Sequence, residues 1–190
     1  MAFAYRSLIP VLWLAWAAYW WRASRGVKAV QRVESMLSRA QHVAPLALAM
    51  VLLAMPRFPV PVLGERFLPW PEECYWIGAA LTLLGLLFTV WARVHLGGNW
   101  SGIITVKESH ELVTSGPYGI VRHPIYTGLL LAFAGSGLAR PEWRSVLAVA
   151  IAFGALWRKL RIEERFMREH FGPAYEAYSA RVRALVPYVF

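Results

Sequence analysis

The chain has 190 residues, of which 58% are hydrophobic, with ten Trp and a formal net charge of +9 at pH 7. Its mean hydropathy is +0.43, which excludes an ordinary soluble domain of this length and indicates an integral membrane protein. The basic residues are spread between apolar segments, so membrane topology explains the charge and nucleic-acid binding is not favoured. Without internal repeats, the length predicts a single membrane domain, residues 1–190.

Five apolar segments follow one another. A simple membrane span needs about 20 residues, and only the first and third segments are comfortably long enough. The segments are Phe3–Trp21, His42–Met55, Tyr75–Val94, Ile125–Ala139 and Val146–Trp157. The second segment gains length if its helix begins near Met36. The short turn Arg140–Arg144 joins the last two segments into a helical hairpin. Because both are short, this hairpin must tilt, thin the bilayer locally or lie partly inside the protein. The sequence therefore predicts an all-α, polytopic membrane protein with about five transmembrane or half-membrane helices and a cytoplasmic helical tail.

The first apolar segment resembles a secretory signal in length, but its flanks do not. Arg6 is its single leading cation, Trp residues crowd it, and Arg22 follows without a small-x-small cleavage pattern. We expect a retained anchor.

The loops differ in basic residues, and this difference predicts the orientation. The loop after the first segment contains five cations, namely Arg22, Arg25, Lys28, Arg32 and Arg39, whereas Pro56–Glu73 has only Arg57 and Arg66 against three Glu. The first loop is therefore expected on the cytoplasmic side. Alternation then places Arg93–His123 and the tail from Arg158 onward on the same side, in what we expect to be a bacterial inner membrane.

Cysteine and histidine give no sign of a disulfide framework or a metal site. Cys74 is the single cysteine, and the five His are not spaced to place two ligands on one helical face. No metal is expected.

The stretch Thr114–Gly128, TSGPYGIVRHPIYTG, concentrates polar chemistry beside the apolar segments. Pro124 suits the first turn of a helix and the residue before it favours an extended backbone, so a helix should begin there. Its unpaired N–H groups and dipole would attract an anion, and Gly128, one turn on, would let a flat group approach the backbone. The alternative is structural: Arg122 reaches lipid headgroups, His123 caps the helix and Tyr126 belongs to an interfacial aromatic belt.

An acidic pair, Glu163 and Glu164, continues the helix that leaves the hairpin, and Gly172-Pro173 predicts its end. Helical spacing places Glu163 on one side with Lys159. A solvated face with i,i+4 ion pairs, such as Glu164 with Arg168, is the structural alternative for these charges.

Taken in order, these motifs resemble the isoprenylcysteine carboxyl methyltransferase family, with phospholipid N-methyltransferases as more distant relatives. The resemblance rests on GPYxxxRHPxYxG, then RIEE, FGxxYxxY and the terminal Val186-Pro187, and it covers roughly Leu96–Pro187, including LGGNWS at 96–101. It implies an S-adenosyl-L-methionine-dependent methyltransferase whose lipid-like or prenylated acceptor arrives from the bilayer. Residues 1–95 would then form N-terminal transmembrane helices, and 96–190 the cofactor-binding and catalytic region.

The resemblance also implies roles for individual residues. The cofactor pocket would be shaped by Tyr118, His123, Pro124, Tyr126, Gly128 and Glu164. An acceptor carboxylate is ionised at neutral pH and needs a cation, for which Arg158 or Arg122 offers a guanidinium fork. An amine acceptor would instead need Glu163 as a base.

Two further hypotheses remain open. Related membrane folds include NADPH-dependent reductases of isoprenoid or sterol double bonds, which need extra phosphate-binding cations. A non-catalytic membrane module, in which the motif only stabilises the hairpin, is the other. Gly97-Gly98 lacks the surroundings of a GxGxxG nucleotide-binding loop and is weak evidence for such a loop.

Overall fold

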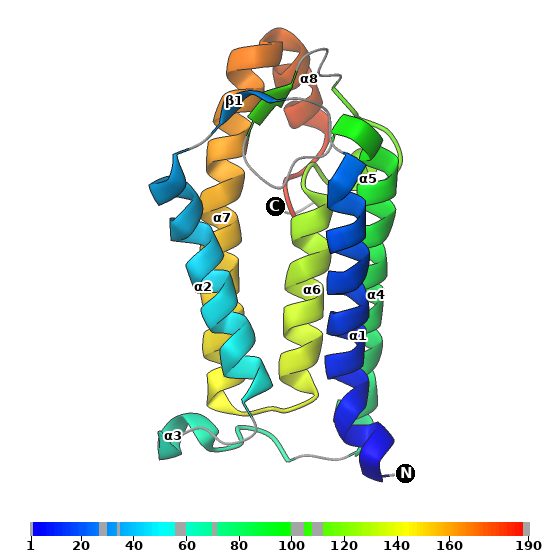
Figure 1. The fold of residues 1–190 in the computed structure, drawn as a ribbon, viewed down its shortest axis with the longest axis vertical. Coiled ribbons are helices and arrows are strands. Elements are labelled where there is room, and N and C mark those ends of the chain that lie inside the picture. Colours follow the sequence, from blue (N-terminus) through cyan, green and yellow to red (C-terminus); the bar gives the residue numbers. More distant parts are fainter. Residues whose placement is uncertain are drawn as a thin grey trace.

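A computed structural model describes residues 2–26, 30–33, 35–55, 60–69, 72–99, 105–107 and 112–187. Long helices run side by side along the longest axis of the molecule (Figure 1). The α-helices are α1 (Ala2–Ala23), α2 (Met36–Ala54), α3 (Pro61–Gly64), α4 (Glu72–Leu96), α5 (Pro117–Ile120), α6 (Pro124–Leu138), α7 (Trp143–Phe171) and α8 (Pro173–Arg181). Short 3-10 turns follow α1 and α4, at Ser24–Gly26 and Gly97–Asn99.

Local sequence signals set several helix ends. Helix α2 begins at Met36, as predicted, because the Ser35 hydroxyl accepts the Ser38 N–H at 3.2 Å and caps the first turn. Helix α6 begins at Pro124, also as predicted. Helix α7 ends at Phe171, before Gly172 with φ of 50°, a backbone conformation that favours glycine.

Close packing of α4 against α6 forms the centre of the bundle. A Cβ atom on Gly85 would lie 2.5 Å from the carbonyl oxygen of Gly128, and one on Gly135 would lie 2.6 Å from that of Gly78. The two backbones can approach this closely only because glycine has no side chain. This contact fixes the position of α6, which carries the predicted site at its N-terminus.

Polar side chains inside the bundle are paired between helices. The Trp13 indole N–H of α1 donates to Ser136 Oγ of α6 at 3.0 Å, and the Ser136 hydroxyl lies 3.2 Å from Thr82 Oγ1 of α4. The Trp16 indole donates to Thr89 Oγ1 at 2.7 Å. Such bonds hold α1 against α4 and α6 where apolar contact alone gives little preference in lipid.

Two described helices, α2 with 19 residues and α4 with 25, are long and apolar enough to cross a membrane. The expected hairpin is present, since α7 follows α6 after a short turn, and α6 is a shorter apolar helix of 15 residues. The predominantly helical fold agrees with the all-α prediction.

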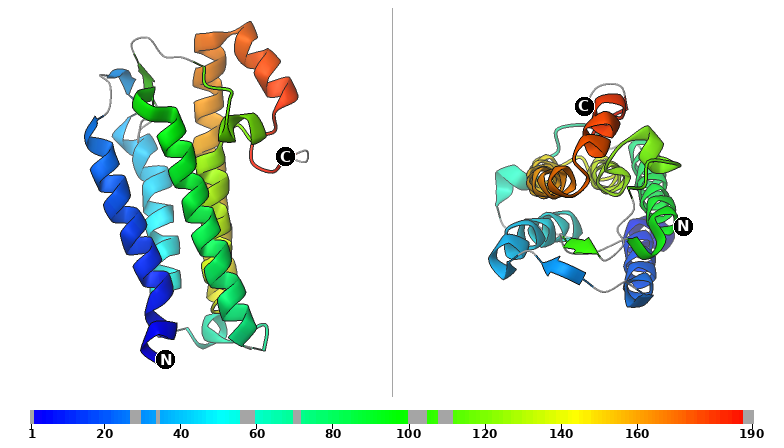
Figure 2. Two further views of the ribbon diagram at one scale, coloured as in Figure 1. Left: turned by 90° about the vertical axis from the view of Figure 1, so that its right-hand side faces the viewer. Right: turned by 90° about the horizontal axis from the view of Figure 1, so that it is seen from above.

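One feature was not predicted: a two-stranded antiparallel ribbon of β1 (Val30–Val33) and β2 (Thr105–Lys107). It lies at the same end of the bundle as α5 and α8, whereas α3 lies at the opposite end (Figure 1). Seen along the bundle, α8 packs outside the α6/α7 pair (Figure 2). The predicted site residues of α5, α6 and the last part of α7 therefore gather at one end.

Candidate functional site

The site begins at the sharp turn before α5. Gly116 has φ of 58°, and a Cβ atom there would lie 2.7 Å from the His95 ring, so both conformation and space require glycine. The turn buries Tyr118, whose carbonyl oxygen accepts the Tyr178 hydroxyl of α8 at 2.6 Å. Burial, and next the negative charge of Glu163, raise the pKa of the Tyr118 phenol above its ordinary value. Tyr118 therefore remains a neutral phenol at the edge of the site.

Arg122 joins three segments of the chain at the start of α6. Its Nε donates to Glu164 Oε1 of α7 at 2.8 Å, and its Nη2 contacts the same carboxylate oxygen. Its Nη1 donates to the carbonyl oxygens of Ser179 and Val182 at the end of α8. The guanidinium is thus engaged within the protein, and the predicted role of Arg122 as an acceptor clamp is not favoured by this geometry.

The C-terminal segment 182–187, here called the tail, lies across the beginning of α6. The N–H groups of Arg122 and His123 donate to the carbonyl oxygens of Arg183 at 2.8 Å and Ala184 at 3.0 Å. The Thr127 hydroxyl donates to Leu185 O at 2.7 Å. The tail therefore uses part of the N-terminal hydrogen-bonding capacity that the sequence suggested for an anion.

His123 lies between the two carboxylates of α7. Its Nδ1 is 3.7 Å from Glu163 Oε2, and its Nε2 is 3.4 Å from Glu164 Oε1. Nε2 is buried and has no hydrogen-bond partner among the described residues. The ring stacks on Tyr126 of α6, with centroids 5.3 Å apart and planes inclined by 5°. The structure thus brings His123, Tyr126 and the acidic pair together, as predicted.

Glu164 is a buried, ionised carboxylate, with its side chain only 7% exposed. Burial alone would raise its pKa, but the proximity of His123 and the bonds and charge of Arg122 outweigh burial and lower it to about 2. Arg168 also donates to Glu164 at 3.1 Å, so the i,i+4 pair named in the structural alternative is present. Because the carboxylate is buried, however, this pair does not form part of a solvated charged face.

Glu163 faces a second cation, Lys159, one turn earlier on α7. The Lys159 Nζ lies 3.9 Å from Glu163 Oε1 and 5.6 Å from the centre of the Tyr126 ring. The Lys159 side chain is 13% exposed. We call Arg122, His123, Lys159, Glu163 and Glu164 the charged cluster.

Gly128 does not face an open pocket. A Cβ atom at this position would lie 2.6 Å from Gly85 O and 2.7 Å from a methyl group of Thr89, so α4 fills the space. This geometry favours a packing role for Gly128 over the predicted approach of a flat group to its backbone. Pro124, in contrast, is buried at the first position of α6 and sets the helix start.

Arg158 is not brought to the acidic pair. Its guanidinium donates to Ser38 O at 3.3 Å and to the Gln41 side chain, both in α2. The predicted acceptor clamp at Arg158 is therefore not favoured, because the side chain links α7 to α2 instead.

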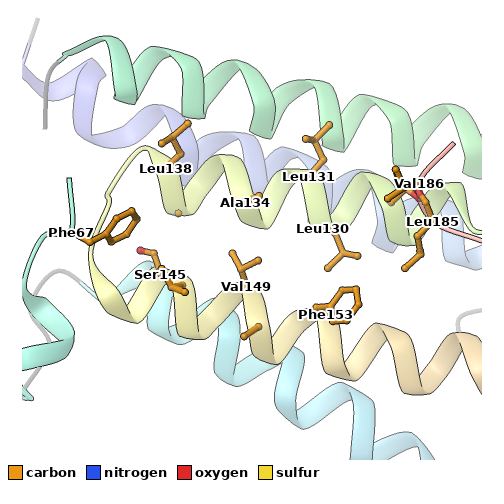
Figure 3. Close-up of a pocket in the computed structure, with 14 residues that line it drawn as sticks. Phe67, Leu130, Leu131, Ala134, Leu138, Ser145, Val149, Phe153, Leu185 and Val186 are labelled. Atoms are coloured by element: carbon orange, nitrogen blue, oxygen red, sulfur yellow. The ribbon is translucent and has the colours of Figure 1, made fainter. Parts of the chain in front are cut away.

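An apolar groove runs along α6 and α7 on the side of the tail, with a volume of about 750 Å³. Thr127 and Leu130 of α6 line it near the charged cluster, where Leu185 of the tail also contributes. Phe67 lies at the other end, near Leu138 and Ser145 (Figure 3). We call this the α6/α7 groove. It begins at the same helical turn that carries His123, since the Thr127 N–H donates to His123 O at 3.0 Å.

Comparisons with known proteins identify the family. The model of the phospholipid methyltransferase family matches residues 74–174, more than half of the chain. The chain belongs to the phospholipid methyltransferase family. Membership confirms the predicted methyltransferase class and the integral membrane character. The family match also begins within α4, earlier than residue 96, where the recognised motifs begin.

Proteins similar to this phospholipid methyltransferase family member are named isoprenylcysteine methyltransferases. Protein-S-isoprenylcysteine O-methyltransferase B of Arabidopsis thaliana is 31% identical over 132 residues, 65% of this chain and 66% of that protein. A probable protein-S-isoprenylcysteine O-methyltransferase of Oryza sativa subsp. indica is 27% identical over 165 residues, 82% of this chain and 80% of that protein. The predicted resemblance to isoprenylcysteine methyltransferases is confirmed.

A solved structure shares the fold of this family member. The eukaryotic intramembrane Ras methyltransferase, an isoprenylcysteine carboxyl methyltransferase, superposes with a TM-score of 0.55 at 22% identity. The match covers 78% of this chain but 53% of the solved chain, so this protein spans about half of that length.

Two contributions to the site were not assigned from the sequence. Helical spacing predicts that Lys159 lies on the same side of its helix as Glu163. Its position over the Tyr126 ring, however, depends on how α6 packs on α7. The tail was recognised only as a motif, whereas its carbonyl oxygens hold Arg122 and His123. The hydrophobic-Pro ending at Val186-Pro187 was the signal that pointed to this segment.

Proposed function

We propose that this protein is an S-adenosyl-L-methionine-dependent methyltransferase that O-methylates the carboxylate of a lipid-like, isoprenylcysteine-type acceptor. One observation carries the proposal: the charged cluster and the apolar α6/α7 groove meet at the first turn of α6. The Thr127 hydroxyl donates to Leu185 O at 2.7 Å and lies 3.2 Å from His123 O, a second acceptor, where the two regions join. An amphiphile with a polar reacting end and an apolar chain matches both parts.

The residues of the charged cluster suit S-adenosyl-L-methionine. When bound, this cofactor supplies an electrophilic methyl group on a sulfonium. Glu163 and Glu164 give the site negative charge that suits its positive groups. The buried Nε2 of His123, 3.4 Å from Glu164 Oε1, makes no hydrogen bond to the described residues and could make one to the cofactor. Tyr126 and Tyr118 would provide flat, buried surfaces beside it. Arg122 would position Glu164 and the tail.

The acceptor carboxylate needs orientation rather than a base. Its reference pKa near 3.5 leaves it ionised at neutral pH. Lys159 is the cation that α7 places beside Glu163 and Tyr126, so we assign to it the orientation that the sequence suggested for Arg158. The surrounding apolar residues Leu156, Leu160 and Leu185 would exclude water from the reacting end.

Calorimetric binding of S-adenosylhomocysteine to the detergent-purified protein tests the cofactor site, with NADPH as the comparison ligand. We expect saturable binding of the first alone. We also expect His123→Ala and Glu163→Gln to weaken it at least tenfold, while Glu176→Gln, an exposed change on α8, leaves it unchanged. Binding of NADPH alone would favour a reductase, and binding of neither by the folded protein would favour a non-catalytic module.

The family name supports a second acceptor class, a phospholipid amine. An ammonium group must lose a proton before methylation, and Glu163, beside His123, would accept it. Methyl transfer to an S-prenyl thiol carboxylic acid and to phosphatidylethanolamine in bilayers distinguishes the two. Turnover of the amine alone, with a strong dependence on Glu163, would replace O-methylation by N-methylation.

We further propose that the charged cluster faces the cytoplasm of a bacterial cell. The excess of basic residues after α1 supports this orientation. Ser24, exposed at that end, and Cys74, in the first turn of α4 at the opposite end, form a matched pair for labelling. In the Ser24→Cys, Cys74→Ser protein, a membrane-impermeant thiol reagent should react only from the cytoplasmic side. Reaction only from outside would reverse the orientation.

A further inference from the structure

Phe67 lies at the far end of the α6/α7 groove, on a loop that is fixed to the α6–α7 turn. The Phe67 N–H donates to Pro141 O at 3.0 Å, and the Trp143 N–H donates to Glu65 O at 3.1 Å. The Phe67 and Trp143 rings are in contact, with centroids 5.4 Å apart. These two backbone bonds flank Arg66 and fix the loop to the α6–α7 turn, so they hold Phe67 at the end of the groove.

A buried ion pair supports this end wall. Arg144 is 1% exposed and donates to Glu142 Oε2 at 2.5 Å and to Met55 O at 2.6 Å. Arg140 donates to the same Met55 carbonyl oxygen at 3.0 Å. A buried guanidinium with several partners cannot move without losing them, so the α6–α7 turn, to which the loop of Phe67 is bonded, is held rigidly.

The length of the groove can be compared with that of a ligand. Thr127 is the first and Leu138 the last residue of α6 that lines it, and the eleven residue steps between them span about 17 Å at 1.5 Å per residue. Three backbone bonds of an extended chain span about 3.5 Å, so an isoprene unit with four bonds spans roughly 4.5 Å. Three units, about 14 Å, fit along the groove, whereas four, about 18 Å, reach Phe67.

We propose that Phe67 is the end stop of the α6/α7 groove and sets the length of the isoprenoid chain that the protein accepts, favouring three units over four. This inference rests on the proposed function, because it places the carboxylate end of the acceptor at the charged cluster. Continuity through Thr127 and Leu185 supports an acceptor chain as the occupant rather than a bulk lipid chain. The apolar side chains of Leu130, Val149 and Phe153 supply the walls.

Chain-length selection by variants tests the end stop. S-prenyl thiol carboxylic acids with two, three and four isoprene units are compared in binding, by displacement of a fluorescent prenyl analogue, and in methyl transfer. Phe67→Ala should raise the four-unit to three-unit ratio of affinity and of kcat/KM by roughly tenfold. Leu68→Ala, the neighbouring exposed residue outside the groove lining, is the matched control and should leave both ratios unchanged.

A second variant shortens the groove from within. Ala134 lines its middle and is exposed, so Ala134→Phe adds a ring there without entering the core (Figure 3). It should shift the preference towards two units, whereas Leu84→Phe, on an exposed part of α4, should not.

The outcomes separate this inference from the proposed function. Unchanged length ratios in folded Phe67→Ala and Ala134→Phe would overturn the end stop, even if methyl transfer proceeds. Shifted affinity ratios without methyl transfer to any acceptor would support the end stop and overturn the proposed reaction. Equal displacement of the analogue by phospholipid and by all prenyl acids would show a lipid-filled groove and overturn the end stop.

Discussion

Arg122 and Glu164 form a buried ion pair that ties the start of α6 to α7, with side chains 11% and 7% exposed. The remaining Arg122 nitrogen reaches the carbonyl oxygens of Ser179 and Val182. Helix α6, helix α7 and the tail are therefore held by one guanidinium. His123, next in the chain, depends on the same arrangement for its position between the carboxylates.

Loss of the Glu164 charge should destabilise the fold. Glu164→Gln leaves the buried Arg122 without its counter-ion, which costs about 3–5 kcal/mol for a broken buried pair. The folded-state pKa of Glu164, about 2, lies below its ordinary value of 4.5. Its ionised form therefore stabilises the fold above pH 4.5, and this contribution is lost as pH falls towards 2. Thermal unfolding in detergent between pH 7 and 3 checks this, since the Tm difference between wild type and variant should shrink on acidification.

Arg122→Lys keeps the charge but removes the fork that reaches both Glu164 and the tail. We expect a loss of about 2 kcal/mol in stability and faster hydrogen exchange in the tail, because an ammonium group cannot make all of these bonds at once. Arg181→Lys is the control, since Arg181 is exposed and its Nε donates to Ala177 O within α8. Equal tail protection in the two variants would contradict the central role of Arg122.

Local signals predicted much of the fold and part of the site. Pro124, Gly172 and Met36 mark helix ends through backbone chemistry that acts over a few residues. The β1–β2 ribbon joins strands that are far apart in the chain, and no local pattern specifies such a pairing. The division into residues 1–95 and 96–190 stays a prediction.

Side-chain partners across helices were harder to predict than helix ends. His123 and the acidic pair could be grouped because their motifs recur in order. The direction of Arg158, by contrast, depends on how α2 packs against α7. Gly128 was expected to admit a ligand, but a glycine that admits a ligand and one that admits a neighbouring helix have the same sequence signal.

Gly128→Ala tests the packing role. The added Cβ atom would lie 2.6 Å from Gly85 O, so α4 and α6 must separate, at a cost of about 1–3 kcal/mol. Gly154→Ala is the matched control, because a Cβ atom there meets nothing within 4 Å and alanine favours the helix by about 1 kcal/mol. Thermal unfolding should therefore move in opposite directions for the two variants. A stable Gly128→Ala protein with weakened S-adenosylhomocysteine binding would restore the cofactor role.

Arg158→Met distinguishes a structural link from an acceptor clamp. Arg158 donates to Ser38 O at 3.3 Å and to the Gln41 side chain, so its loss should weaken the α2–α7 contact by about 1 kcal/mol. Gln41→Ala removes one of the same bonds from the α2 side and should lower the Tm in the same direction. An acceptor clamp would give a different result. The acceptor KM would rise in Arg158→Met with no change in its Tm, and Gln41→Ala would keep both the Tm and the acceptor KM of the wild type.

We expect instead that Lys159→Met raises the acceptor KM and that Lys159→Arg restores it, since Lys159 is the cation that α7 places beside Glu163.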